Sequence, residues 1–331
     1  MAAAPGALRF NTDSLKMELY DGNQWVEIVA TSPEAQTGGA RGVFGSGGTD
    51  PSPIFNVIDY VTISTTGNAQ DFGDLLGAYT IRSSCSSSTR GLFAGGQNGP
   101  APGYTNTIEY ITISSTGNSQ DFGDLTQVKT SLGSCSNSTR GIFGGGVLFS
   151  APTTFQINVI EYVTISSIGN AIDFGDLSHT NANQVSALSS STRGIFGGGA
   201  PNVNIIEFIT ISTTGNSADF GDLTVARHGH EGMSNSIRGL FAGGASPDNV
   251  IDYITIAALG NAIDFGDLTS ARRNSCGTSS STRAVIAGSD YPSTNVIDYV
   301  TIMTTGNAID FGDRTGNYGG RCGLSNGHGG L

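Results

Sequence analysis

The sequence predicts an all-β fold: a six-bladed β-propeller with four-stranded blades, preceded by a small N-terminal β-hairpin module. The first observation is compositional, because glycine makes up 49 of the 331 residues and the apolar residues are rich in Val, Ile and Phe, which favour turns and pleated sheets. The second observation is an internal repeat of six similar units. The third is the alternation of apolar and polar residues in stretches such as 56–64, which is typical of strands.

The repeat is marked by the tetrapeptide Asp-Phe-Gly-Asp. Its copies begin 45 to 52 residues apart, at Asp71, Asp121, Asp173, Asp219, Asp264 and Asp310. The triplet Asp-Phe-Gly holds magnesium in protein kinases, but a kinase carries it once, together with a Gly-rich loop and a His-Arg-Asp loop. Six copies without those companions indicate a structural role in every unit.

Each unit contains four strand-like parts, as expected of a propeller blade. The first part is rich in small residues and ends at an arginine, as in 84–90, and the second follows directly, as in 91–96. The third is the alternating stretch, and a Gly-Asn turn joins it to the fourth, as in 167–177. The Gly-Gly runs after the second part are expected near the crowded centre of the ring, where only glycine fits.

Two spacings within the unit behave differently. From the Asn that opens the third part to the Asp of the fourth, every unit has 15 residues, as expected of a fixed strand pairing. From the repeat arginine to the same Asn, the spacing varies between 11 and 18 residues. The loop between the second and third parts is therefore predicted to lie on the surface and to carry contacts. In loops 97–105 and 147–156, the expected contact residues are Tyr104, Leu148, Phe149 and Phe155.

The repeat also predicts how the ring closes. The last unit supplies a fourth strand and then 321–330, which has the pattern of a first strand. A second and a third strand without a first occur at 41–60. Pairing between these two segments would complete the sixth blade and remove the free sheet edges.

The order Arg-Gly-(Ile/Leu)-Phe-Gly-Gly, followed by a Val-Ile-Glu-Tyr-like strand, resembles the kelch repeat over residues 36–331. The Trp usual in kelch repeats is missing, since the only Trp is Trp25, and the Phe of Asp-Phe-Gly-Asp is expected to take its packing place. The amino-acid sequence of residues 56–96 resembles repeats in structural proteins of tailed bacteriophages, especially the cyanophage and marine phage type. Segment 5–28 looks like a short module of phage fibre and virion-surface proteins. These resemblances imply a propeller associated with the virion.

Residues 1–35 are predicted to form an attachment or oligomerisation module with its linker, and residues 36–331 the propeller. Two or three short strands, at 7–14 and 16–29, are not stable alone in water. They must pack on the propeller as a simple extra hairpin, on a copy of themselves, or on another protein. The expected anchor residues are Leu8, Phe10, Tyr20 and Trp25.

The charge narrows the range of partners. The formal net charge is −12 and the pI is about 4.5, so nucleic acid, whose phosphates the chain would repel, is not expected as a partner.

No run of about 18 apolar residues is present, so membrane insertion is not expected. The first ten residues lack the pattern of a signal peptide. No cofactor is expected, because the glycine runs lack the Lys-Ser/Thr of a phosphate loop.

Each repeat arginine is expected to hydrogen-bond a carboxylate or a carbonyl of an adjacent strand. The six arginines are Arg41, Arg90, Arg140, Arg193, Arg238 and Arg283. The acids of Asp-Phe-Gly-Asp offer too few oxygens for calcium, which takes six to eight ligands. Structural turns, or Asp–Arg pairs across blades, are expected there instead.

The remaining candidate groups are histidines and cysteines. His228 and His230 lie beside Glu231, but no third ligand is evident, so no metal site is expected. The cysteines are predicted to be free thiols, because equivalent points on neighbouring blades lie beyond disulfide reach. They are Cys85, Cys135, Cys276 and Cys322.

Taken with the resemblance, these patterns favour a non-enzymatic bacteriophage virion structural protein, as a tail fibre or spike component or as capsid decoration. It would be assembled in the host cytoplasm and lie on the particle surface. The N-terminal module would bind other virion proteins or further copies of the chain, and the propeller would contact a host-surface glycan or protein. The alternatives are a kelch-type protein-binding adaptor and, less favoured, a glycan-degrading propeller enzyme, which would need a reactive cluster that breaks the repeat.

Overall fold

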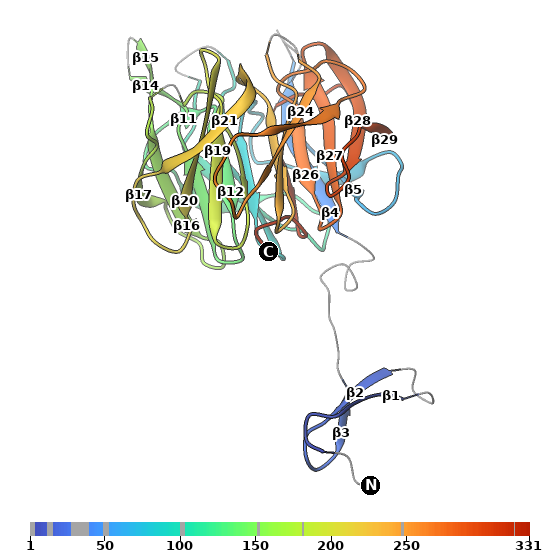
Figure 1. Cartoon of the computed structure of the whole chain (residues 1–331). Helices are drawn as coiled ribbons and strands as arrows, with labels where there is room; N and C mark the ends of the chain where they lie inside the picture. The colour runs from blue at the N-terminus through green and yellow to red at the C-terminus, as the bar shows by residue number, and fades with distance from the viewer. Residues whose placement is uncertain are drawn as a thin grey trace.

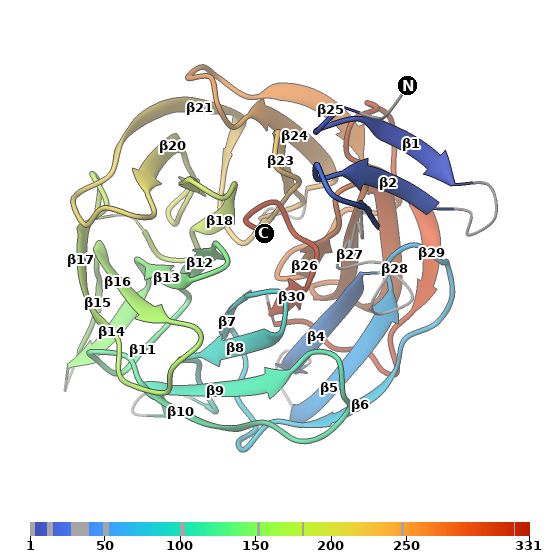
Figure 2. The same cartoon turned by 90° about the horizontal axis from the view of Figure 1, so that it is seen from below.

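The computed structural model describes residues 4–11, 16–27, 40–48, 53–99, 103–150, 153–180, 182–245, 248–320 and 322–331. These residues form an all-β structure with a propeller-like arrangement of antiparallel sheets (Figure 1). No helix in these ranges is long and apolar enough to cross a membrane. In the view turned by 90° about the horizontal axis, the sheets are arranged around a common centre (Figure 2).

Six of the sheets have four strands each, and we number them I to VI along the chain. Their strand orders are β30-β4-β5-β6 (I), β7 to β10 (II), β12-β13-β16-β17 (III), β18 to β21 (IV), β22 to β25 (V) and β26 to β29 (VI). In sheet I, β30 from the end of the described chain pairs with β4 from near its beginning. This is the strand pairing that the repeat predicts for segments 321–330 and 41–60.

The four strands of each sheet correspond to the four parts of the repeat. The innermost strands are β7 (Ser83–Ser86), β12 (Gly133–Ser136), β18 (Ser186–Ser189), β22 (Glu231–Ser234), β26 (Cys276–Ser279) and β30 (Gly323–Ser325). The second strands are β4 (Arg41–Gly48), β8 (Arg90–Ala94), β13 (Arg140–Gly144), β19 (Arg193–Gly197), β23 (Arg238–Ala242) and β27 (Arg283–Asp290). The third strands are β5 (Ile54–Thr62), β9 (Thr107–Thr112), β16 (Val159–Thr164), β20 (Val203–Thr210), β24 (Val250–Thr255) and β28 (Ser293–Thr301). The outermost strands are β6 (Gln70–Asp74), β10 (Gln120–Asp124), β17 (Ile172–Asp176), β21 (Ala218–Arg227), β25 (Ile263–Asp267) and β29 (Ile309–Asp313).

Two smaller sheets accompany these six. The first contains β1 (Leu8–Asn11), β2 (Lys16–Tyr20) and β3 (Trp25–Glu27), so the N-terminal module has three short strands, where two or three are expected. The second contains β11 (Lys129–Thr130), β14 (Val147–Ser150) and β15 (Thr153–Gln156). The predicted module boundary at residue 35, and most of the linker at 31–40, lie outside the described residues.

The core lies between neighbouring sheets. The Phe of each Asp-Phe-Gly-Asp is buried, and in sheet I Phe72 packs edge-on against Tyr60 of the third strand, with ring centroids 5.9 Å apart. Within the second strand of sheet I, a side chain on Gly45 would collide with the ring of Phe93 in sheet II. Glycine at that position therefore allows neighbouring sheets to approach.

The glycines after the second strand do not lie at the centre of the molecule, contrary to the prediction. Gly145 has φ of +70°, and an added Cβ would meet the carbonyl of Ala182 in the segment that leads into sheet IV. Glycine is required there by a left-handed backbone and a close neighbouring carbonyl. The centre is lined by the innermost strands instead.

Candidate functional site

The Asp-Phe-Gly-Asp strands bind the Gly-Asn turn of the next sheet. Gly117 N–H donates to Phe72 O at 2.8 Å, and Asp74 N–H donates to the Asn118 side chain at 3.1 Å. Gly73 has φ of +145°, and the carbonyl of Gly117 occupies the place of a Cβ. The tetrapeptide is therefore a contact between sheets, which explains its six copies.

The same backbone bond recurs between all neighbouring sheets. The donors and acceptors are Gly117 to Phe72, Gly169 to Phe122, Gly215 to Phe174, Gly260 to Phe220, Gly306 to Phe265 and Gly67 to Phe311, at 2.8 to 2.9 Å. The last of these joins sheet VI to sheet I.

The repeat arginines also bridge neighbouring sheets, which confirms the expected bond to a carbonyl. The pairs are Arg41 to Ile113 O, Arg90 to Ile165 O, Arg140 to Ile211 O, Arg193 to Ile256 O, Arg238 to Ile302 O and Arg283 to Ile63 O, at 2.8 to 3.2 Å. Each guanidinium also lies over an aromatic ring of its own sheet, as Arg41 lies 4.4 Å from the centroid of Tyr60. The cation is thus partly compensated by a π face.

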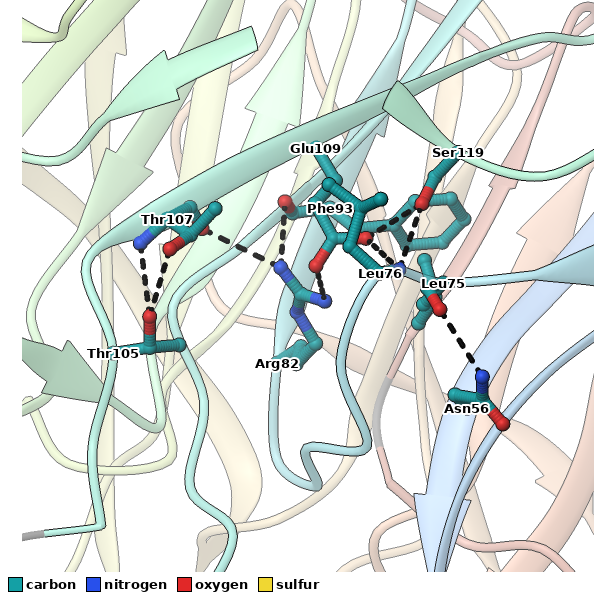
Figure 3. Close-up of polar contacts among 9 residues, drawn as sticks. All are labelled: Asn56, Leu75, Leu76, Arg82, Phe93, Thr105, Thr107, Glu109 and Ser119. Carbon is teal, nitrogen blue, oxygen red and sulfur yellow. Dashed lines mark hydrogen bonds and ion pairs between the residues drawn. The ribbon is translucent and has the colours of Figure 1, made fainter. Parts of the chain in front are cut away.

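A second set of polar groups was missed by the sequence analysis. The acid in the third strand of every sheet is buried, and Figure 3 shows Glu109 in sheet II. Its carboxylate lies 2.6 Å from Arg82 Nη1 and accepts hydrogen bonds from Ser119 Oγ and from Leu76 N–H. The available signal was an acid that follows Ile in the third strand of all six units. An acid repeated among apolar residues indicates a buried pair.

Each of the six acids has its own basic partner. The pairs are Asp59–Arg314, Glu109–Arg82, Glu161–Lys129, Glu207–His179, Asp252–Arg227 and Asp298–Arg272, at 2.5 to 3.0 Å. The expected Asp–Arg pairing was therefore placed on the wrong residues. Within the described chain, no ion pair joins a repeat arginine to an Asp-Phe-Gly-Asp acid, because these acids lie at the outer rim.

Burial shifts the ionisation of these pairs. It lowers the pKa of Lys129 from its usual 10.5, although Glu161 opposes the shift. Burial alone would raise the pKa of Glu207, but hydrogen bonds from His179, Ser217 and Ser178 outweigh it and lower the pKa below 4.5. Glu207 is therefore a charged acceptor that holds sheet IV to the preceding connector.

A series of serine contacts surrounds the centre of the molecule. The last serine of each innermost strand donates its hydroxyl to the carbonyl of the equivalent serine in the neighbouring sheet. The pairs are Ser86 to Ser325, Ser136 to Ser86, Ser189 to Ser136, Ser234 to Ser189, Ser279 to Ser234 and Ser325 to Ser279, at 2.5 to 2.8 Å. The sequence signal was a serine four residues before each repeat arginine from Arg90 onwards.

These six serines line a cavity of about 50 Å³, to which every innermost strand contributes. His328 lies in the same cavity, and the segment 326–331 that carries it ends at the label C, near the common centre of the sheets in Figure 2. Segment 321–330, predicted as a strand, is thus a strand only over Gly323–Ser325. We call the remainder the tail segment, residues 326–331.

The predicted contact residues on the loops lie in or beside β14 and β15. Phe155 in β15 is 52% exposed, and its strand partner Leu148 is half-buried in β14. Phe149 lies in β14, but its side chain is outside the described part. Tyr104 is half-buried and bridges to Gln97. The hairpin β14–β15 stands at the opposite end of the molecule from the tail segment (Figure 1).

The predicted N-terminal anchors lie in the three-stranded sheet. Tyr20 and Trp25 pair across β2 and β3, with ring centroids 5.3 Å apart, and the guanidinium of Arg9 lies 4.2 Å from the Trp25 ring. Leu8 in β1 is 60% exposed. Phe10 lies in β1, and its side chain is among those not described. The structure does not bring these anchors together with the loop residues.

The histidines and cysteines have packing environments. His230 is buried against Phe241, with ring centroids 5.6 Å apart, whereas His228 contacts Asn202. No group of three metal-ligating side chains is found within the described residues. The prediction of free thiols is confirmed for all four cysteines, which are buried. Burial raises the pKa of each thiol, that of Cys135 to about 12, so all four are neutral and unreactive.

No protein-family model matches this chain, and no curated protein matches it either.

Proposed function

We propose that sheets I to VI are the blades of a closed, six-bladed kelch-like β-propeller, and that β30 and β4 make the closing pair. Three series of bonds support this proposal: those of the Gly-Asn turns, the repeat arginines and the serines. Each series passes through six sheets and returns to the sheet where it began. An experimental density map with an open stack, or with another number of sheets, would contradict it.

The protein then acts as a non-enzymatic structural component of a tailed bacteriophage virion. The observation that carries this function is the commitment of the repeated polar groups to contacts between sheets. Acids, arginines and serines recur in every unit and are engaged by neighbours in the same chain. Such an arrangement favours a rigid platform that works through its surface.

The platform offers two surfaces for contact. The hairpin β14–β15 presents Phe155 for a host-surface glycan or protein, since an exposed aromatic residue on a projecting element is a typical binding anchor. The N-terminal sheet, with Leu8, Tyr20 and Trp25, attaches the protein to other virion proteins or to further copies of the chain. Its three short strands gain stability from such packing.

The test combines localisation and binding. Antibody labelling of phage particles should place the protein on the particle surface, and purified protein should bind host cells in a way that Phe155→Ala weakens. Protein found only in host extracts, bound to a cellular protein, would favour the adaptor. Release of sugars from host polysaccharide would favour the enzyme. Either result would overturn the structural role.

A further inference from the structure

The tail segment is hydrogen-bonded to four of the six sheets and lies close to the other two. Asn326 Oδ1 accepts from Arg41 N–H at 2.8 Å, and Gly329 N–H donates to Ser234 O at 2.9 Å. His328 reaches Ser86 and Ser136. The places of a Cβ on Gly327 and Gly329 lie against Ser280 and Ser189, respectively, which adds sheets VI and IV. Six residues of chain thus close one end of the serine-lined cavity.

The partners of His328 determine its protonation state. Nε2 lies 3.0 Å from Ser86 O, and because a carbonyl only accepts, Nε2 carries the proton. Nδ1 accepts from Gly330 N–H at 3.1 Å, so Nδ1 carries none. The imidazole is therefore neutral in this arrangement. A proton added to Nδ1 would make it a donor that faces the Gly330 N–H, which is also a donor. The hydrogen bond between Gly330 N–H and Nδ1 would then break.

Among the residues that the structure describes, no Asp, Glu, Lys or Arg side chain lines this cavity. The lining comes from all six innermost strands, and its titratable members besides His328 are the thiols of Cys85 and Cys135. Burial raises the pKa of both thiols, so they remain neutral. A protonated imidazole would find no counter-charge among these residues.

The fit of the glycines is equally close. A Cβ on Gly330 would overlap the carbonyl of Ser136, and a Cβ on Gly329 would overlap that of Asn235. The site therefore accepts a His followed by two residues without side chains. This selectivity resembles that of a peptide-binding site already occupied by its ligand.

We propose that the serine-lined end of the central cavity is a binding site for a His-Gly-Gly peptide with a neutral imidazole, that the tail segment occupies it, and that acidification releases the tail segment. This proposal goes beyond the virion role and does not depend on it. It needs only the six innermost strands and the contacts of His328.

The direction of the pH effect follows from linkage. Burial lowers the pKa of His328 from its usual 6.5, and the bond to Ser86 O only partly opposes this. The seated form is therefore fully favoured above pH 6.5. Between pH 6.5 and the lowered pKa, the equilibrium for release rises by about tenfold per pH unit.

The first experiment uses NMR on the full chain. The His328 imidazole, assigned by its loss in H328Q, should show a pKa below 6.5 and the Nε2–H tautomer. The exchange protection of the Gly330 amide should fall about tenfold per pH unit in the same range. H328Q keeps a donor for Ser86 O but cannot be protonated, so its tail segment should stay seated at acidic pH. A His328 pKa at or above 6.5, or Gly330 protection that does not follow it, overturns the proposal.

The second experiment vacates the site in a full-length chain. Gly330→Val should expel the tail segment, and a synthetic peptide of residues 326–331 should then bind at pH 7.5. The same peptide with Ala at 328 should bind about tenfold more weakly, as expected for the loss of the hydrogen bond from the half-buried imidazole to Ser86 O. Equal binding of the two peptides to the folded variant, or no binding, contradicts the proposal. If the variant does not fold, the NMR titration of the unaltered chain decides.

Discussion

The two ends of the six sheets differ in how much they vary. At the end with the Gly-Asn turns, which we call the turn side, every sheet makes the same contacts to its neighbour, through the turn, the arginine and the serine. At the end with the loops between second and third strands, which we call the loop side, sheet III carries β14 and β15, whereas sheet VI extends β27 and β28 instead. The difference indicates that the repeated contacts at the turn side hold the sheets together, so that the loops at the loop side can vary in length and structure.

The buried ion pairs show both behaviours in one contact. The carboxylate comes from the third strand and stands at the same position in all six sheets. The basic partner comes from the loop side, from the end of an outermost strand or from the connector that follows it, and is Arg, Lys or His at different positions. A buried acid fixes the need for a cation, but several chain positions can bring one within reach.

The largest expected effect is at the pair that joins the two ends of the described propeller-like body. Arg314→Met leaves Asp59 buried without its cation, so we expect the free energy of unfolding to fall by about 3–5 kcal/mol. Arg273→Met is the matched control, because Arg273 is 33% exposed and lies 3.8 Å from Asp290. Its expected cost is below about 1 kcal/mol. Urea denaturation of both variants measures the difference, and equal losses would contradict the assignment.

The next largest loss of stability is expected at a glycine on the turn side where two neighbouring sheets approach each other closely. Gly123 and Gly117 both have positive φ, +144° and +154°, so alanine at either should cost about 1–3 kcal/mol in backbone strain. An added Cβ would meet the neighbouring sheet only at Gly123, where it would collide with the carbonyl of Gly169, whereas the place of a Cβ at Gly117 is open. Gly123→Ala should therefore cost about 1 kcal/mol more than Gly117→Ala. Thermal unfolding can compare them, and equal costs would show that the sheets adjust to a Cβ.

Much of this pattern follows from the sequence. The fixed spacing of 15 residues predicts the pairing of third and fourth strands, and the arginine in every unit predicts a bond to a neighbouring strand. The choice between carbonyl and carboxylate could not be made, because it depends on which sheet edge faces the guanidinium. The cation partners were also out of reach, since Arg314 and Asp59 are 255 residues apart.

A smaller effect is expected in the pH dependence of stability, at the buried pair Glu207–His179. The pKa of Glu207 is lowered, so its stabilising contribution is present above pH 4.5 and is lost as pH falls through the lowered value. The slope for one proton is at most about 1.4 kcal/mol per pH unit. In His179→Gln, one of the bonds that lower this pKa is changed, so the acid-induced loss should be smaller than in the unaltered chain. Denaturation from pH 3 to 6 tests this, and identical slopes would count against it.

The smallest effect on stability is expected on the loop side. Phe155→Ala removes an exposed ring, so the free energy of unfolding should change by less than about 0.5 kcal/mol. Phe143→Ala, at a fully buried position between sheets, should cost about 3–5 kcal/mol. Calorimetry on the pair checks the contrast. A large loss for Phe155→Ala would mean that β15 supports the fold and is not a free surface.

The sequence by itself determined the all-β class, the six units, the strand order within each unit and the place where loops vary. These features depend on residues close in the chain, where periodicity and turn chemistry act directly. Only the tertiary structure decided which basic side chain each buried acid receives, and that His328 of the tail segment enters the serine-lined cavity instead of the segment extending β30. Those contacts join residues far apart in the chain, and their energies arise from burial, which exists only once the sheets have assembled.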